Sequence, residues 1–341
     1  MDILTQGLLG GVLAQAVCKD DEKKTATLAG FAAGLLADAD VLIHSSSDPL
    51  LSLEYHRHFT HALIFIPFGA ALAALLLWPL LRKSCSWQRL YLFCFAGYSL
   101  SGLLDACTSY GTQLFWPFSE ARIAFNIISI LDPVFTLALA ISLVAGLWMK
   151  QRVLALYGLA FCLLYLSFGK LQQERASLLA QHLIEERGHS AVSHIVKPTL
   201  ANLLLWRSVY RDDERIYVDA IRMGVFSEAL IYQGESLPIF SFEKDMHWLE
   251  TDSLLYRDIG RFIRFSDGYV ANDPTQHNVI GDIRYSMLPI SAKPLWGIRI
   301  DQTRINEHVD YQFYRENARE VRPAFKAMLL GRDDVKELVP K

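Results

Sequence analysis

TLAGFAAGLLADADVLI (residues 27–43) and HALIFIPFGAALAALLLWPLL (residues 61–81) are two apolar stretches whose ionisable residues gather at one end. Asp38 and Asp40 lie near the end of the first stretch, and His61 opens the second, shortly after His56. Ionisable groups beside membrane-length apolar segments are costly, so they need a partner. Carboxylates and imidazoles are typical ligands of Zn²⁺ and related ions. The two stretches therefore predict a membrane protein with a metal site at one membrane face.

The apolar character extends through the first half of the 341-residue chain. Hydrophobic residues make up 52% of the sequence and charged residues 20%, which is too apolar for an ordinary soluble enzyme. Several stretches approach the roughly 20 residues that a bilayer helix requires: about 25–43, 61–81, 90–108 and 130–149, with a shorter one at 153–169. The opening stretch 8–17 is either a tilted span or a half-buried hairpin, and it lacks the basic flank of a signal peptide. We expect about five to six hydrophobic helices.

Basic residues in the short loops predict the orientation of these helices. They are Lys19, Lys23 and Lys24, then Arg82, Lys83 and Arg89, then Lys150 and Arg152. If these loops face the cytoplasm, residues 38–60 and 109–130 emerge on the outer face. The ionisable residues of the apolar half then meet at that face, although they are far apart in sequence: Asp38, Asp40, His56, His61, Asp105 and Asp132.

The composition changes beyond about residue 170, where charged and apolar residues alternate at helical spacing. We expect a helical membrane domain over 1–169, an amphipathic connecting helix over 170–190, and a small soluble α+β domain over 191–341 on the outer, periplasmic side. Strands are predicted at 215–226, 278–290, 295–301 and 308–314, and a helix at 247–265. The net charge of −3 gives no indication of a nucleic-acid partner.

Asp38 and Asp40 are two residues apart, so on a continuous helix they would point in different directions. Both can face one ion only if the helix ends there. Asp105, in an apolar helix, needs a partner, which is either a metal or a hydrogen bond between helices. Arg57 is suited to orienting a carboxylate or holding a phosphate. Thr60 can cap the helix that His61 opens.

Three further residues are weaker candidates. Glu54 is a possible general base, supported by proximity alone. Asp132 precedes Pro133, so it is either part of the pocket or the N-cap of a helix. Asn126 is ambiguous in the same way.

Ordered motifs along the chain resemble the YdjM-type family of inner-membrane proteins, which are predicted to be metal-dependent hydrolases. The matching stretches are MDILTQGLLGG (1–11), LLADADVL (35–42), YHRHFTHALIF (55–65), LLDACTSYGTQLFWPFS (103–119) and RIAFNIISILDPVFTL (122–137), with 197–222 and 281–301 similar to the family's soluble part. The resemblance implies that Asp38, Asp40, His56, His61 and Asp105 bind the metal. It places Asn126 and Asp132 near the same pocket.

One position departs from the family pattern. Family members usually have a histidine four residues before the aspartate of the LLD motif, on the same helix face, and here that residue is Ser101. The loss of an imidazole would weaken metal binding, change the preferred metal or leave an inactive descendant. The histidine and aspartate pattern is also similar, more distantly, to zinc-dependent phospholipase C and related nucleases, an analogy that implies phosphoester hydrolysis.

We therefore expect a membrane hydrolase that uses a divalent metal, zinc or alternatively manganese, to activate water against a phosphoester or lipid-like substrate at the outer face of the bilayer. The alternative is a non-catalytic membrane protein that binds a partner through its soluble domain, with the polar cluster holding helices together. A transporter fits least, because transport sites usually lie near the bilayer midplane.

Overall fold

The computed structural model describes residues 1–314 and 318–339, which divide into two compact units. The first unit comprises Met1–Ile43, Tyr55–Leu171 and Leu200–Asn202. The second comprises His44–Glu54, Gln172–Thr199 and Leu203–Lys341. The second unit thus takes a short segment from the middle of the membrane-type sequence.

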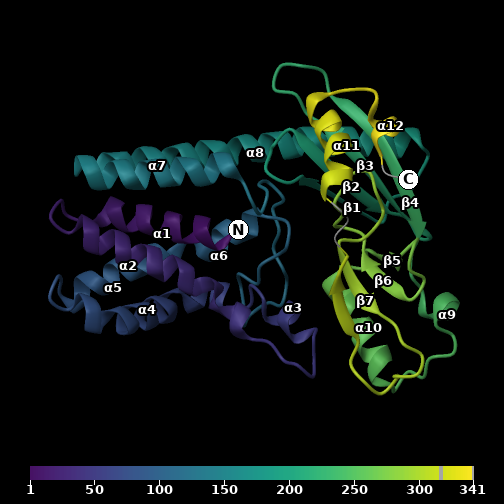
Figure 1. The fold of residues 1–341 in the computed structure, drawn as a ribbon, viewed down its shortest axis with the longest axis horizontal. Helices are drawn as coiled ribbons and strands as arrows, with labels where there is room; N and C mark the ends of the chain where they lie inside the picture. The colour runs from purple at the N-terminus through teal and green to yellow at the C-terminus, as the bar shows by residue number, and fades with distance from the viewer. Residues whose placement is uncertain (315–317, 340–341) are drawn as a thin grey trace. The chain divides into compact units, whose positions relative to one another are not determined.

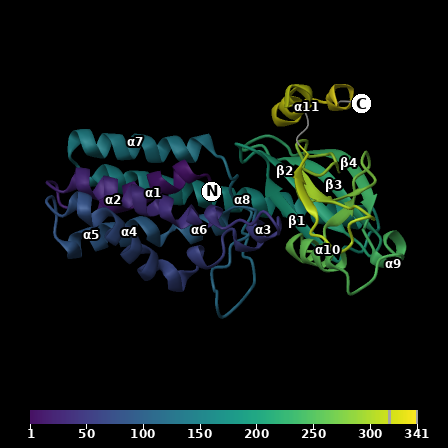
Figure 2. The same cartoon turned by 60° about the horizontal axis from the view of Figure 1, so that its bottom comes forward.

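The first unit is a bundle of apolar helices (Figures 1 and 2). Its members are α1 (Ile3–Val17), α2 (Lys23–Leu36), α4 (Ile66–Leu81), α5 (Trp87–Ser99), α6 (Ser101–Cys107), α7 (Pro133–Met149) and the first part of α8 (Arg152–Glu186). α1 packs against α2, α5 and α7, and α4 packs against α5. Asp2 caps α1 by accepting a hydrogen bond from the Thr5 backbone N–H, and Ser86 caps α5 in the same way.

Glycines let α1, α2 and α5 approach closely. A Cβ atom built on Gly10 would lie 2.3 Å from the carbonyl oxygen of Gly30, and one on Gly97 would lie equally close to that same oxygen. Small residues at helix crossings are the usual means of packing helices in a membrane, where backbones must approach for good contact.

Among the residues that the structure describes, four helical segments are long and apolar enough to cross a membrane: Lys23–Leu42, Leu63–Leu81, Trp87–Cys107 and Arg152–Glu186. They confirm the membrane character that the sequence predicts. α1 and α7 are also apolar but have only 15 and 17 residues. The separate helices expected at 153–169 and 170–190 are instead one helix, α8, of 35 residues. No proline interrupts residues 152–186, so the chain has no local reason to break there.

The second unit contains two antiparallel sheets of four strands each, in the orders β1-β2-β3-β4 and β5-β6-β7-β8. Their bounds are β1 (Ser193–Pro198), β2 (Leu205–Arg211), β3 (Arg215–Arg222), β4 (Leu230–Pro238), β5 (Val270–Asn272), β6 (Val279–Asp282), β7 (Trp296–Arg299) and β8 (Asp310–Phe313). The accompanying helices are α9 (Phe242–Asp245), α10 (Leu254–Phe265), α11 (Ala318–Leu330) and α12 (Val335–Leu338). The predicted strands correspond to β3, β6, β7 and β8, and the predicted helix to α10.

Candidate metal centre

Three short elements of the first unit place the candidate ligands. α2 ends at Leu36, and the chain continues as a 3-10 helix, η1 (Ala37–Leu42), which carries Asp38 and Asp40. A second 3-10 turn, η2 (Phe59–His61), ends with His61. Asp105 lies in α6, which is separated from α5 at Leu100. The α-helix therefore ends where both aspartates would need it to end.

Asp38, His61 and Asp105 form a compact buried group. One ligand atom from each residue lies within 4.8 Å of the others. His61 Nε2 is 2.9 Å from Asp105 Oδ2 and 3.3 Å from Asp38 Oδ1. Two oxygens and one imidazole nitrogen are a donor set that a divalent metal accepts.

The local geometry fits a metal ion. His61 Nε2 and Asp105 Oδ2 are buried, yet no hydrogen bond of good geometry reaches either atom from the described residues. Ligands bound to zinc at 2.0–2.1 Å in a tetrahedral arrangement lie about 3.3 Å from each other, close to the separations seen here. Buried ligand atoms this close together, without a well-aligned hydrogen bond to either, are an arrangement that a shared ion would produce.

The other nitrogen of the His61 ring faces Asp40 and Thr60. His61 Nδ1 is 3.4 Å from Asp40 Oδ2 and 3.0 Å from the Thr60 hydroxyl. A carboxylate on the second nitrogen of a ligand histidine fixes the tautomer and the ring orientation. Asp40 therefore lies on the opposite edge of the imidazole from Asp38 and Asp105.

Asp40 also organises the loop that carries His56. Its carboxylate accepts a hydrogen bond of 2.6 Å from the Arg57 backbone N–H and lies 3.3 Å from His56 Nδ1. The His56 side chain is 33% exposed. The structure thus brings His56 to Asp40 and leaves it outside the buried group of three.

Two cationic groups surround Asp105. The buried Arg57 places its Nε 3.2 Å from Asp105 Oδ2 and donates a hydrogen bond of 2.7 Å to Thr108. The amino group of Met1 forms an ion pair with the other carboxylate oxygen. Arg57 therefore lies at ion-pair distance from a carboxylate of the buried group.

Burial alone would lower the pKa of His61, but its contacts with Asp105, Asp38 and Asp40 outweigh that effect and raise the pKa to about 10 in the metal-free protein. The three carboxylates thus hold a positive charge strongly at this position. Either a protonated imidazole or a metal ion would supply that charge.

Gly102 permits the close approach of α6 to the loop carrying His61. A Cβ atom on Gly102 would lie 2.1 Å from the His61 carbonyl oxygen. The preceding residue, Ser101, is buried, and its carbonyl accepts a hydrogen bond from the Gln6 side chain. Ser101 lies on the same short helix as Asp105.

The weaker candidates have other contacts. Asp132 caps α7 by accepting a hydrogen bond from the Phe135 N–H, and it also accepts one from the Tyr165 hydroxyl. Asn126 has a positive φ of 56° and bonds to the Ala124 carbonyl within its own turn. Glu54 belongs to the second unit, where it pairs with Arg261.

Sequence reasoning did not identify Tyr98 and Thr108 as parts of this centre. The Tyr98 hydroxyl donates a hydrogen bond of 2.6 Å to the Thr60 carbonyl, and the buried Thr108 hydroxyl accepts from Arg57. The Thr60 side chain, expected to cap a helix, instead contacts Asp40 and His61. Thr108 follows Asp105 by three residues and lies directly after the end of α6.

A family model described as YdjM inner membrane protein matches residues 1–176. All the candidate ligands lie within this range, whereas the two C-terminal stretches that resemble the family's soluble part lie outside it. No curated protein and no solved structure matches the chain.

Proposed function

Because the chain belongs to the YdjM inner membrane protein family, we propose that it is a membrane-bound, metal-dependent hydrolase acting at the outer face of the inner membrane. The observation that carries this proposal is the buried group of Asp38, His61 and Asp105, whose ligand atoms lie within 4.8 Å of one another. Its second unit would then be periplasmic.

In this proposal Asp38, His61 and Asp105 hold a divalent ion, zinc or alternatively manganese. When bound, such an ion supplies Lewis-acid chemistry of the kind that activates water toward an ester. Asp40 and Thr60 hold the His61 imidazole in one orientation. Arg57 holds the Asp105 carboxylate and offsets part of its charge.

The open side of this centre lies at Asp38. The Asp38 side chain is 11% exposed, whereas His61 and Asp105 are fully buried. Val41 and Leu42, which follow in η1, are 65% and 74% exposed. Apolar side chains beside the most accessible of the three ligands favour a lipid-like substrate, and the metal favours a phosphoester within it.

A second candidate function is a non-catalytic membrane protein in which the buried polar residues hold helices together. The cationic groups close to the buried carboxylates favour it. Three carboxylates, from Asp38, Asp40 and Asp105, face groups that can carry positive charge: Arg57, a protonated His61, His56 and the Met1 amino group. This balance requires no metal. A partner would then bind through the second unit.

Hydrolysis of defined substrates separates the two candidates. The detergent-purified full chain, loaded with zinc or manganese, is assayed on a soluble phosphodiester and on phospholipid vesicles. We expect metal-dependent turnover that Asp38→Asn abolishes and that His277→Ala, at an exposed histidine of the second unit, leaves unchanged. No turnover with either metal on either substrate, or turnover that persists in Asp38→Asn, would overturn the proposal.

A further inference from the structure

The segment His44–Glu54 has an unusual place in the fold. In sequence it lies between Asp40 and His56, whose side chains contact each other in the first unit. The segment itself nevertheless folds as part of the second unit. Three residues lie between Asp40 and His44 at one end, and one lies between Glu54 and His56 at the other. Any displacement of this 44–54 segment is therefore passed on through very short connections.

Arg261 of α10 binds the 44–54 segment through its charged groups. Its guanidinium donates two hydrogen bonds to Asp48, at 2.9 and 3.1 Å, and two to Glu54, at 2.8 and 3.0 Å. A fifth, of 2.9 Å, goes to the buried Asp258 in the same helix. These five bonds use all five donors of a guanidinium. Two bidentate pairs on one arginine fix both carboxylates in position as well as in charge.

Asp258 is itself held in place. Its second carboxylate oxygen accepts hydrogen bonds of 2.8 Å from His308 Nδ1 and 3.1 Å from the Val309 backbone N–H. Asp258, fixed by these two bonds, in turn binds the Arg261 guanidinium. The position of the guanidinium is therefore set by α10 and its neighbours and not by the 44–54 segment alone.

Apolar contacts strengthen this attachment. Leu50 and Leu53 are 1% and 7% exposed, and they belong to the same buried cluster as Leu255, Ile259 and Phe262 of α10. The Asp48 side chain also accepts a hydrogen bond from the Leu50 backbone N–H, which orders the turn that presents both groups.

We propose that Arg261 is a positioning residue for the metal centre: it fixes the 44–54 segment to the second unit and so restricts the loop that carries Asp40 and His56. The loop is closed at its base by the hydrogen bond from the Arg57 N–H to Asp40. Fixing its middle removes conformational freedom that would otherwise oppose this closure. Asp40 then keeps the His61 ring in its binding orientation.

This inference rests on the proposed metal centre and adds a role for residues beyond the family match. Arg261 and Asp258 lie outside residues 1–176, whereas Asp48 and Glu54 lie inside. The second unit would thus tune a site whose ligands it does not supply.

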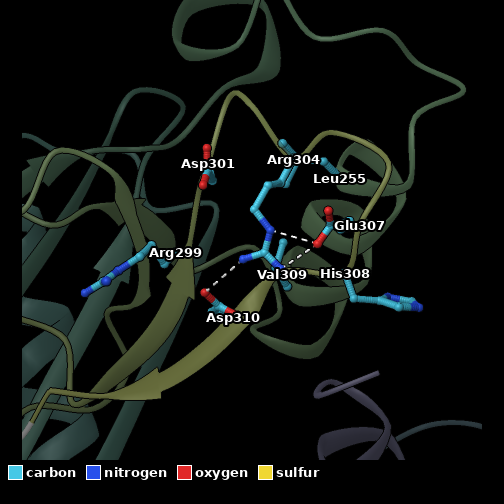
Figure 3. A pocket seen from close by; sticks show the side chains of 8 residues that line it. All are labelled: Leu255, Arg299, Asp301, Arg304, Glu307, His308, Val309 and Asp310. Carbon is cyan, nitrogen blue, oxygen red and sulfur yellow. Dashed lines mark hydrogen bonds and ion pairs between the residues drawn. The ribbon is translucent and has the colours of Figure 1, made fainter. Parts of the chain in front are cut away.

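The test compares Arg261→Gln, the double variant Asp48→Asn/Glu54→Gln, and the triple variant that combines them. The matched control is Arg304→Gln. Arg304 belongs to the same unit and forms ion pairs with Glu307 and with Asp310 (Figure 3). In that view the His308 side chain points away from Arg304, so the control leaves the Asp258 support in place. Zinc affinity of the full chain in detergent is measured alongside amide hydrogen exchange of residues 55–61 in metal-free protein.

Loss of an interaction that orients a metal ligand typically weakens binding by about 10- to 100-fold. We expect Arg261→Gln to weaken zinc binding about tenfold and to speed exchange at residues 55–61. The triple variant should be no worse than the double, because both lose the same attachment. If the substitutions instead lowered the stability of the whole chain, their effects would be additive, and the triple variant would bind zinc more weakly than the double variant. Amide exchange in α1 and α2 would then be faster as well.

The outcomes separate this inference from the proposed function. If the unaltered chain binds zinc and Arg261→Gln binds it equally well, the inference is overturned and the metal centre stands. If the unaltered chain binds no metal, the proposed function fails, and unchanged exchange at residues 55–61 in Arg261→Gln would overturn the inference as well. Should Arg261→Gln not fold, Asp48→Asn carries the same comparison, because it replaces one of the two acceptor oxygens that face Arg261 with an amide NH2 and removes the negative charge.

Discussion

Substitution of Gly102 by alanine should disrupt the metal centre without touching a ligand. The added Cβ would lie 2.1 Å from the His61 carbonyl oxygen and 3.2 Å from a methyl group of Leu114. Ordinary carbon–oxygen contacts are about 3.3–3.6 Å, so the two backbones must separate by about 1.2 Å. Overpacking of this kind costs about 1–3 kcal/mol. Because Asp105 follows Gly102 by one helical turn, His61 and Asp105 move apart.

A metal site tolerates errors in ligand distance of only about 0.2 Å. We therefore expect Gly102→Ala to weaken zinc binding at least about tenfold, measured by calorimetric titration of detergent-purified protein. Gly260→Ala is the control, since a Cβ atom there meets nothing within 4 Å and the residue lies inside α10. That change should leave zinc binding intact and stabilise the helix by up to about 1 kcal/mol. Equal zinc affinities of Gly102→Ala and the unaltered chain would refute the assigned geometry.

Three further predictions concern the surroundings of His61. Arg57→Gln should lower the free energy of unfolding by about 3 kcal/mol, because it removes a cation from the buried Asp105; an unchanged unfolding midpoint in detergent would contradict this. Tyr98→Phe should cost about 1 kcal/mol by the same measurement, because it leaves the Thr60 carbonyl without that donor, and no loss would show that the bond contributes nothing. In metal-free protein the raised pKa of His61 contributes stability that is complete below pH 6.5 and is lost as the pH rises through about 10. The melting temperature of the metal-free protein should therefore fall between pH 7 and pH 10 in the unaltered chain but not in His61→Asn. Saturating zinc should remove this pH dependence, because a metal-bound imidazole is neutral. A melting temperature that does not change with pH in the metal-free unaltered chain would contradict the link between His61 protonation and stability.

Periodicity and composition were sufficient to predict an N-terminal part with membrane-length apolar helices and several strands of the C-terminal part. Apolar runs of bilayer length are rare outside membrane-spanning helices, and the stretch around Asp219 alternates as an antiparallel strand should. The end of α2 near Asp38 could also be expected, since two aspartates that are two residues apart cannot share one face of a helix. Helix length, strand alternation and the end of a helix depend on residues close together in the sequence, so they can be predicted from it.

Asp38 and Asp40 have different contacts with His61, and these depend on tertiary structure that no local sequence pattern predicts. Asp38 and Asp40 have the same side chain in nearly the same context, yet they face different nitrogens of one ring. Which aspartate faces which nitrogen is decided by the turn of η1 and by the approach of α6 at Gly102. Their separate roles therefore could not be read from the sequence.

The attachment of the 44–54 segment was equally hidden. Leu50 and Leu53 follow a polar run of serines and look like part of an exposed loop. Their burial comes from α10, about 200 residues further along the chain. A single sequence gives no means of pairing Asp48 and Glu54 with Arg261 across that separation.

The most direct test of the proposed metal centre is the metal content of the detergent-purified full chain, measured by elemental mass spectrometry beside His61→Ala and His56→Ala. We expect one divalent ion per chain in the unaltered protein, its loss in His61→Ala and its retention in His56→Ala, because His61 shares the buried group with Asp38 and Asp105 whereas His56 lies outside it. Metal that persists in His61→Ala, or a chain that takes up none when zinc or manganese is supplied at neutral pH, would contradict it.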